Sequence, residues 1–220
     1  MAEMTRELRS IEITDDRDPL AREAVRLIRE SIGDVQSTAD LLSELEERRR
    51  GLPTGGDYHL MALVSPDGRI AAAAAGVYLE AANAGFITYL AVRSDQRGKE
   101  LGRELRGDLV HAFRSDARRT AGRELDWVVG EVRRESRWLA TLVDSGNAIP
   151  FDVSYFHPWL PRSAAGKYVL YRESVGDHRA DIPAHEVLRL LYLIWRRAYR
   201  IDHPLQSDTF CLMLEELEMD

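Results

Sequence analysis

The stretch from Tyr89 to Leu105, YLAVRSDQRGKELGREL, constrains the fold of this chain more than any other segment. Residues 86–92 are rich in β-branched and aromatic side chains, which favours a strand. Apolar residues then recur at every fourth position from Leu101 to Phe113, as on one face of a helix. A polar stretch separates the strand from the helix, and two glycines, Gly98 and Gly102, stand at its end and at the start of the helix. We therefore predict a strand, a polar turn and an amphipathic helix in direct succession.

A turn of this kind is suited to bind an anion. The first N–H groups of a helix have no partner inside the helix and lie at the positive end of its dipole. Glycine lets a ligand approach the backbone closely. A Walker loop is excluded because it would need glycine at Arg93 and serine or threonine at Glu100. A dinucleotide-binding turn is excluded because the G-x-G-x-x-G spacing and a preceding parallel repeat are both missing.

The residues Arg97-Gly98-Lys99-Glu100-Leu101-Gly102 resemble the acyl-coenzyme A loop of the GCN5-related N-acetyltransferase (GNAT) family. That pattern is Arg or Gln, two residues, Gly, one residue, then Gly or Ala. The chain departs from it at Glu100, whose side chain we expect to point to solvent. The resemblance implies acetyl-CoA as co-substrate, with its pyrophosphate on the loop amides and its pantetheine arm paired with the preceding strand. Arg93, Arg97 and Arg103 flank this expected polyanion. The cofactor-binding residues expected on this basis are Leu90, Ala91, Val92, Arg97, Gly98, Lys99, Glu100, Leu101, Gly102 and Arg103.

The order of the other predicted elements is similar to that of the same family over about residues 8 to 175. The eleven elements run β-α-α-β-β-β-α-β-α-β-β, and the resemblance implies an α+β fold with a mixed, mostly antiparallel sheet flanked by helices. The run Ala71 to Ala75 has helical propensity. We nevertheless predict a strand over 70–79, because a tight turn precedes the run and little room is left for a helix. The last two strands are expected over 149–156 and 167–172.

A helical extension is predicted beyond residue 175. One helix opens at Ile182-Pro183, and a second carries Phe210, Met213 and Leu217. Because the first helix is apolar on more than one face, it must be covered on more than one face. The extension therefore packs on the core or joins a second subunit, and we expect a homodimer, since cyclic dimers are the commonest oligomers. The expected organisation is a GNAT-like domain of residues 1–175 and an extension of residues 176–220.

Acyl transfer to an amine needs a base, because an ammonium group has no lone pair. The resemblance implies that the acetyl carbonyl lies where strands 86–92 and 125–132 part, near Thr88, Tyr89 and Val129. Glu131, at the far end of the second strand, is the first candidate for the base, and Glu80 is the second. The alternative is that Glu131 simply forms an ion pair with Arg133 or Arg134.

The acid that protonates the leaving thiolate is harder to assign. In the family it is usually a tyrosine four residues before a glycine that closes the following helix. Counted from Gly146, that position in this chain is Leu142. Tyr155 is the candidate in its place, with Tyr89 and His157 as further possibilities. A buried Tyr155 that only satisfies a backbone partner is the competing interpretation.

Composition limits the partners. The chain has 220 residues, of which 45% are hydrophobic and 30% charged, as in a globular protein with one sizeable core. No apolar run approaches the roughly 18 residues of a membrane span, and the N-terminus is charged where a signal peptide is apolar. We expect a cytoplasmic protein without a membrane partner. Cys211 is the only cysteine, which excludes an intrachain disulfide and a multi-cysteine zinc site, and no metal is expected.

The net charge of −7 argues against nucleic-acid binding and mildly favours a cationic acceptor. The predicted function is therefore an N-acetyltransferase that moves an acetyl group from acetyl-CoA to a primary amine by direct attack. The sequence leaves open whether the acceptor is a small molecule or a protein. The alternative is a non-catalytic acyl-CoA sensor or scaffold on the same fold, which Glu100 and the missing tyrosine keep open.

Overall fold

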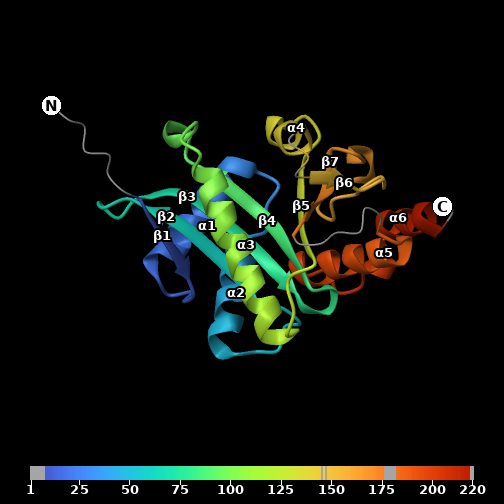
Figure 1. The fold of residues 1–220 in the computed structure, drawn as a ribbon, viewed down its shortest axis with the longest axis horizontal. Coiled ribbons are helices and arrows are strands. Elements are labelled where there is room, and N and C mark those ends of the chain that lie inside the picture. Colours follow the sequence, from blue (N-terminus) through green and yellow to red (C-terminus); the bar gives the residue numbers. More distant parts are fainter. Residues whose placement is uncertain (1–7, 145, 147, 176–181, 219–220) are drawn as a thin grey trace. The chain divides into compact units, whose positions relative to one another are not determined.

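The computed structural model describes residues 8–144, 146, 148–175 and 182–218. Seven strands form a mixed sheet flanked by helices, in the strand order β1-β2-β3-β4-β5-β7-β6, so the predicted fold class is confirmed. Figure 1 traces these elements along the chain. They are β1 Arg9–Ile13, α1 Pro19–Ile32, α2 Thr38–Arg50, β2 Tyr58–Val64, β3 Ile70–Leu79, β4 Ala84–Val92, α3 Leu101–Thr120, β5 Trp127–Arg133, α4 Arg137–Asp144, β6 Ala148–Pro150, β7 Tyr168–Ser174, α5 Ala184–Leu193 and α6 Asp208–Glu218.

The chain divides into two compact units. The first consists of Met1–Val77 and Ile87–Ser115, and the second of Tyr78–Phe86 and Asp116–Asp220. The domain boundary expected near residue 175 falls inside the second unit, and residues 176–181 lie outside the described part of the chain. Among the described helices, none combines the length and the apolar character needed to cross a bilayer.

Both helices that open the first unit begin at side-chain caps. Asp18 accepts a hydrogen bond from the N–H of Leu20 at the start of α1, and proline follows at the first helical position. Ser37 and Asp40 form a reciprocal capping box at the start of α2. A capping side chain and a proline at the first helical position are local signals that can be read in a sequence.

The alanine-rich segment 71–75 is a strand, as predicted. It belongs to β3, which pairs antiparallel with β2, and every residue of both strands is buried. The pairing sets Leu60 against Ala75 and Met61 against Ala74. Small side chains suit a strand that is covered on both faces, and this tertiary context outweighs the helical propensity of alanine.

A partly exposed polar cluster around the buried His59 joins β1 to α2 and β2. The carboxylate of Glu12 accepts hydrogen bonds from Arg48 and from His59 Nδ1, the latter at 2.6 Å. Burial raises the pKa of Glu12, but the hydrogen bonds and charges of His59 and Arg48 outweigh burial and lower this pKa to about 2. The ionised carboxylate is therefore a stabilising element of the first unit.

In the second unit, β5, β7 and β6 form an antiparallel ladder that carries α4. Gly130 of β5 lies opposite Tyr171 of β7, and a Cβ atom at Gly130 would be 2.5 Å from the tyrosine hydroxyl. Leu142 of α4, Ala148 and Tyr171 form a small apolar core. The position where the family usually has a tyrosine is therefore filled here by a packing leucine.

The strand predicted over residues 149–156 is wrong beyond Pro150. Strand β6 covers only Ala148–Pro150, and most of the following segment leaves the sheet. Proline has no N–H to give to a ladder and is confined to edges and strand ends. The N–H groups of Ser154 and Phe156 bond to side chains of α6 instead of a neighbouring strand. The C-terminal extension thus redirects this segment.

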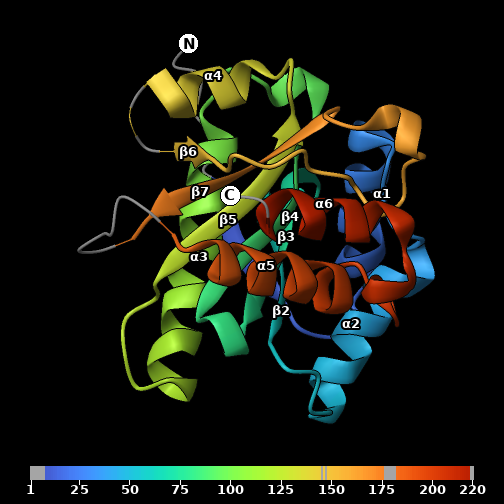
Figure 2. The same ribbon diagram turned by 90° about the vertical axis from the view of Figure 1, so that its right-hand side faces the viewer.

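The extension packs on its own unit. Helix α5 continues into a π-helical turn, Ile194–Ala198, and α6 runs beside α5 (Figure 2). The ring of Trp195 lies 5.0 Å from that of Phe210, and the ring of Tyr199 lies 6.0 Å from that of Phe86. Of the two alternatives for covering these helices, packing on the core is observed. A homodimer stays a prediction.

Candidate active site

The predicted phosphate turn has the backbone geometry of an anion site. After β4 the chain makes one 3-10 turn, Ser94–Gln96, and Gly98 then adopts a positive φ of 82° before α3 begins. Within the described residues, the main-chain N–H groups from Gly98 to Gly102 have no acceptor. These open donors lie at the start of a 20-residue helix, where the dipole also favours negative charge.

Glu100 adopts the left-handed conformation in this turn, with a φ of 60°. Its carbonyl oxygen accepts the first bonds of α3, from the N–H groups of Arg103 at 2.9 Å and Glu104 at 3.1 Å. Glycine reaches this conformation without the steric cost that a Cβ atom brings. The chain thus keeps the turn that glycine favours, although it carries glutamate there.

The side chain of Glu100 points to solvent, as expected from the sequence. It is 69% exposed and forms an ion pair with Arg103 at 2.8 Å. A neighbouring cation therefore offsets the anion that this substitution introduces. Arg97 and Lys99 are also exposed and add positive charge to the turn.

Gly102 lets α3 lie close to β4. A Cβ atom at this position would be 3.2 Å from Leu90 Cδ2 and 3.6 Å from Val92 Cγ2. The structure therefore brings the predicted loop residue into contact with two predicted pantetheine-strand residues. Ala91, between them, is buried.

Arg93 has a structural role instead of a place in the turn. Its guanidinium donates to the carbonyl of Ile70 through Nε at 3.0 Å and Nη2 at 2.9 Å, and it lies near Glu23. Its N–H donates to the carbonyl of Ala71. Three arginines were expected beside the polyanion. Arg97 and Arg103 are the two whose side chains remain available at the turn.

Strand β4 also carries a buried hydroxyl without a partner among the described residues, the Oγ1 atom of Thr88. Burying a hydroxyl without a hydrogen bond costs about 1–3 kcal/mol. The neighbouring Tyr89 is engaged with Gln36, whose Oε1 lies 3.3 Å from the tyrosine hydroxyl. The open amides and flanking cations of the turn fit the phosphate groups of a ligand.

A second group of predicted residues meets in the second unit, around Glu131 of β5. The hydroxyl of Tyr155 donates to Glu131 Oε2 at 2.7 Å, and His157 Nε2 lies 3.2 Å from Glu131 Oε1. The side chains of His157 and Glu131 are 1% and 4% exposed, and Tyr155 is also buried. We call these three residues the Glu131 cluster.

The alternative pairing of Glu131 with Arg133 or Arg134 is wrong. Arg134 donates to the carbonyl of Gly166 at 2.9 Å, and Arg133 Nε lies 3.4 Å from the hydroxyl of Tyr168. These hydrogen bonds of the two arginines therefore go to partners other than the carboxylate of Glu131. The two partners of Glu131 are instead a phenol and an imidazole.

The protonation of His157 follows from its two contacts. The N–H of Trp159 donates to Nδ1 at 3.2 Å, so Nδ1 acts as an acceptor and carries no proton. The ring proton is then on Nε2 and points to Glu131. His157 is thus a neutral donor, and both oxygens of the carboxylate accept a hydrogen bond.

Sequence reasoning named all members of the Glu131 cluster but did not predict that they meet. Tyr155 and His157 are separated from Glu131 by 24 and 26 positions, and no spacing rule links them. One signal was available, since residues two apart in an extended segment share a face. Glu80, the second candidate for the base, is exposed in the turn Glu80–Ala82 and is not part of this cluster.

Comparison with known proteins supports the fold. No protein-family model matches the chain, and no curated protein matches it. The structure is similar to the ribosomal-protein-S18-alanine N-acetyltransferase of Escherichia coli, with a TM-score of 0.53 and 12% identity, over 79% of this chain and 99% of that chain. It is also similar to the PaiA N-acetyltransferase of Thermoplasma acidophilum in complex with coenzyme A, with a TM-score of 0.53 and 11% identity, over 76% of this chain and 99% of that one.

A third similar structure is an acetyltransferase of the GNAT family from Staphylococcus aureus Mu50, with a TM-score of 0.53 and 10% identity, over 76% of this chain and 99% of that chain. Likeness at this level of identity concerns the path of the backbone. The chain therefore has the fold of the GNAT acyl-CoA N-acyltransferases.

Proposed function

We propose that this protein is an N-acyltransferase of the GNAT type, which transfers an acetyl group from acetyl-CoA to a primary amine. The observation that carries the proposal is the turn before α3, where the amides from Gly98 to Gly102 are open and Arg97, Lys99 and Arg103 surround them. A fold shared with acetyltransferases supports the same function.

In this proposal the turn binds the pyrophosphate of acetyl-CoA. The open N–H groups donate to phosphate oxygens, and the exposed cations neutralise part of their charge. Bound acetyl-CoA supplies an activated thioester. Leu90 to Val92 are proposed to hold the pantetheine arm, and the Thr88 hydroxyl is proposed as a donor to the acetyl carbonyl.

The Glu131 cluster is proposed to supply the base. The acceptor must lose a proton before its nitrogen can attack, and a carboxylate is a suitable acceptor for that proton. Tyr155 can relay the transfer, because it donates to Glu131 Oε2 while its own oxygen keeps a lone pair. The new C–N bond then forms as the C–S bond breaks, and the thiolate leaves with the bonding electron pair. The second proton of the nitrogen passes to the thiolate, which gives a neutral amide and the free thiol of coenzyme A.

The acceptor is proposed to be a cationic primary amine, in keeping with the net charge of −7. One structural neighbour is named for acetylation of an alanine on ribosomal protein S18. A peptide with an N-terminal alanine therefore belongs in an acceptor panel beside a polyamine, an aminoglycoside, an amino acid and a lysine peptide. A homodimer through the C-terminal helices is a separate proposal that sedimentation equilibrium tests.

The test combines calorimetry with a thiol-release assay. We expect acetyl-CoA to bind, at least one amine of the panel to release coenzyme A steadily, and Glu131→Gln to lower kcat by about a hundredfold or more, as loss of a general base does. The amide of glutamine can still accept from His157 and reach Tyr155, so this variant should fold. Absence of binding at millimolar acetyl-CoA would refute the proposal.

The second candidate is a non-catalytic acyl-CoA sensor. Two observations favour it, the glutamate at position 100 and the leucine at position 142, where the family has glycine and usually tyrosine. A sensor would bind acetyl-CoA without releasing coenzyme A for any amine, and Glu131→Gln would leave its affinity unchanged.

A further inference from the structure

We propose that the C-terminal extension, residues 182–218, supports catalysis because contacts from Tyr199, Met213 and Glu216 hold the Glu131 cluster in place, with His157 as a positioning residue for Glu131. This inference rests on the proposed function. In this proposal the extension acts on the site of its own chain, and no second subunit is needed.

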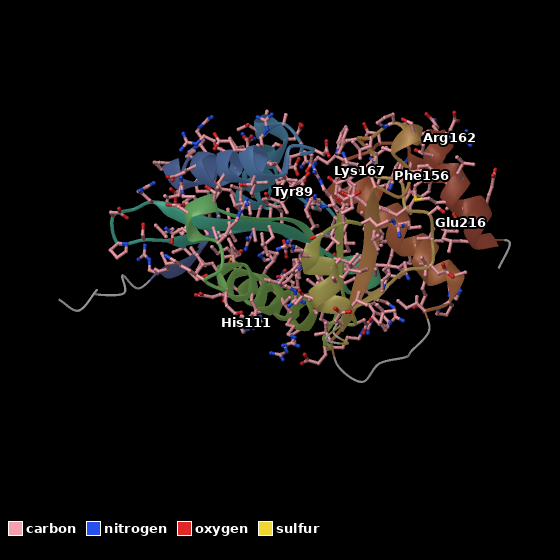
Figure 3. All side chains as sticks on the ribbon, turned by 90° about the horizontal axis from the view of Figure 1, so that it is seen from above. Tyr89, His111, Phe156, Arg162, Lys167 and Glu216 are labelled. Atoms are coloured by element: carbon pink, nitrogen blue, oxygen red, sulfur yellow. The ribbon has the colours of Figure 1, made fainter. Side chains whose placement is uncertain are left out.

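The first support is the alternation of contacts along residues 154–157. The N–H of Ser154 donates to Glu216 Oε1 at 3.0 Å, and the N–H of Phe156 donates to Met213 Sδ at 3.4 Å. Both acceptors belong to α6, and Figure 3 labels Phe156 and Glu216 on this part of the molecule. The N–H groups of residues 154 and 156 are thus bound to the extension, while the side chains of the alternate residues, Tyr155 and His157, reach Glu131.

The second support is the packing of the imidazole. The ring of His157 lies 5.0 Å from that of Tyr199, edge on, and 5.1 Å from that of Tyr168. Tyr199 follows the π-helical turn directly, and its N–H donates to the carbonyl of Ile194 five residues earlier. Turns of this type are rare and are frequently found at functional sites.

The third support is the composition of the Glu131 cluster. A buried carboxylate is ordinarily paired with a cation, and leaving one without such a partner is costly. Glu131 has two neutral donors, and the nearby arginines 133 and 134 bond elsewhere. An apolar side chain would stabilise this core better than a carboxylate. The arrangement is therefore explained by proton transfer and not by stability.

His157 is fixed in one orientation by these contacts. A ring flip would remove the acceptor from the N–H of Trp159 and the donor from Glu131 at once. The imidazole therefore directs a single N–H at Oε1, which leaves Oε2 for Tyr155 and the proton in transit.

The geometry is tested first by a measurement that does not need turnover. A long-range ¹H–¹⁵N spectrum of the full chain reports which imidazole nitrogen of His157 carries the proton, with assignment through the spectrum of His157→Gln. We expect the neutral Nε2–H form. A proton on Nδ1 in the wild-type protein would overturn the inference even if the protein acetylates amines.

Kinetics then test the positioning role. His157→Leu should lower kcat by about tenfold to a hundredfold, as loss of an orienting neighbour does, with KM for acetyl-CoA changed less than about twofold. His157→Gln should recover most of the loss, because its amide can still donate to Glu131. An unchanged kcat in His157→Leu, or a glutamine variant as slow as the leucine variant at equal Tm, would overturn the inference.

The role of the extension is tested by a matched pair on α6. Glu216→Ala removes the acceptor of the Ser154 N–H and should lower kcat about fivefold, the factor that one hydrogen bond of ordinary net strength supplies. Glu216→Gln keeps an oxygen acceptor and should recover the rate. Glu215→Ala alters an exposed neighbour and is the control. Equal kcat values for Glu216→Ala and Glu215→Ala would overturn the role given to α6, whereas a wild-type protein without turnover would instead refute the proposed function.

Discussion

Replacing Glu100 with glycine separates the two effects that this residue has on the turn. Its φ of 60° lies in the left-handed region, where a Cβ atom is disfavoured. Its carboxylate is 69% exposed, beside the amides proposed to bind pyrophosphate. Glu100→Gly relieves the backbone and removes the charge, whereas Glu100→Gln removes the charge alone.

The effect on stability should be small. Relief of the left-handed conformation contributes about 1–2 kcal/mol. The greater freedom of glycine in the unfolded chain offsets about 0.4–1 kcal/mol of this, and loss of the exposed pair with Arg103 offsets at most about 0.5 kcal/mol. The net change therefore lies between a loss of about 0.5 kcal/mol and a gain of about 1.6 kcal/mol, so Tm should shift by no more than about 6 °C.

The effect on binding should be larger. Two unit charges about 7 Å apart repel by about 0.6 kcal/mol in a water-like dielectric. A pyrophosphate with two charges is then repelled by about 1.2 kcal/mol, which corresponds to a factor of five to ten in Kd. Removing Glu100 also releases Arg103 from its ion pair, so that its guanidinium can contact phosphate.

Calorimetric titration with acetyl-CoA measures this effect. Both variants should bind five to ten times more tightly than the wild-type protein at low ionic strength, and the gain should shrink in about 0.5 M salt because exposed charges are screened. If both variants bind no more tightly at low salt, the turn does not hold the pyrophosphate and the electrostatic reasoning is refuted.

Three further outcomes follow from the packing and the charges. Gly102→Glu should abolish acetyl-CoA binding in the same titration, because its side chain meets Leu90 and adds an anion to the turn. An unchanged Kd would exclude the turn as the binding site of acetyl-CoA. Gly130→Ala should destabilise the protein by about 1–3 kcal/mol and lower Tm by several degrees, because its Cβ would be 2.5 Å from the Tyr171 hydroxyl; an unchanged Tm would contradict this. Because the pKa of Glu12 is lowered to about 2, its ionisation stabilises the fold fully above pH 4.5, and this stability is lost as pH falls towards 2. Glu12→Gln should therefore cost about 1–2 kcal/mol at pH 7, after allowance for partial exposure, and almost nothing near pH 2; a cost independent of pH in denaturant titrations would contradict the assignment.

Much of the fold was predictable from local signals. The caps at Asp18 and Ser37, and the leucine periodicity of α3 report directly on backbone structure. The strand over 70–79 was predictable despite its alanines, because the turn before it and the short distance to β4 left no room for a helix.

The rest depends on contacts that a linear pattern does not carry. Strand β6 ends at Pro150 because α6 binds the N–H groups of Ser154 and Phe156, and α6 lies some sixty residues later in the chain. The meeting of Glu131 with Tyr155 and His157 depends on this same redirection. The left-handed conformation of Glu100 had no sequence signal except the glycine usual at that position in the family.

The central claim is that the amides of the turn before α3 bind the pyrophosphate of acetyl-CoA. The most direct measurement is a ¹H–¹⁵N spectrum of the backbone during titration with acetyl-CoA. We predict large, saturating shifts of the amides of Gly98, Lys99, Glu100, Leu101 and Gly102, and similar shifts with coenzyme A. Saturable binding that leaves these amides unmoved, or no change at millimolar ligand, would contradict the account.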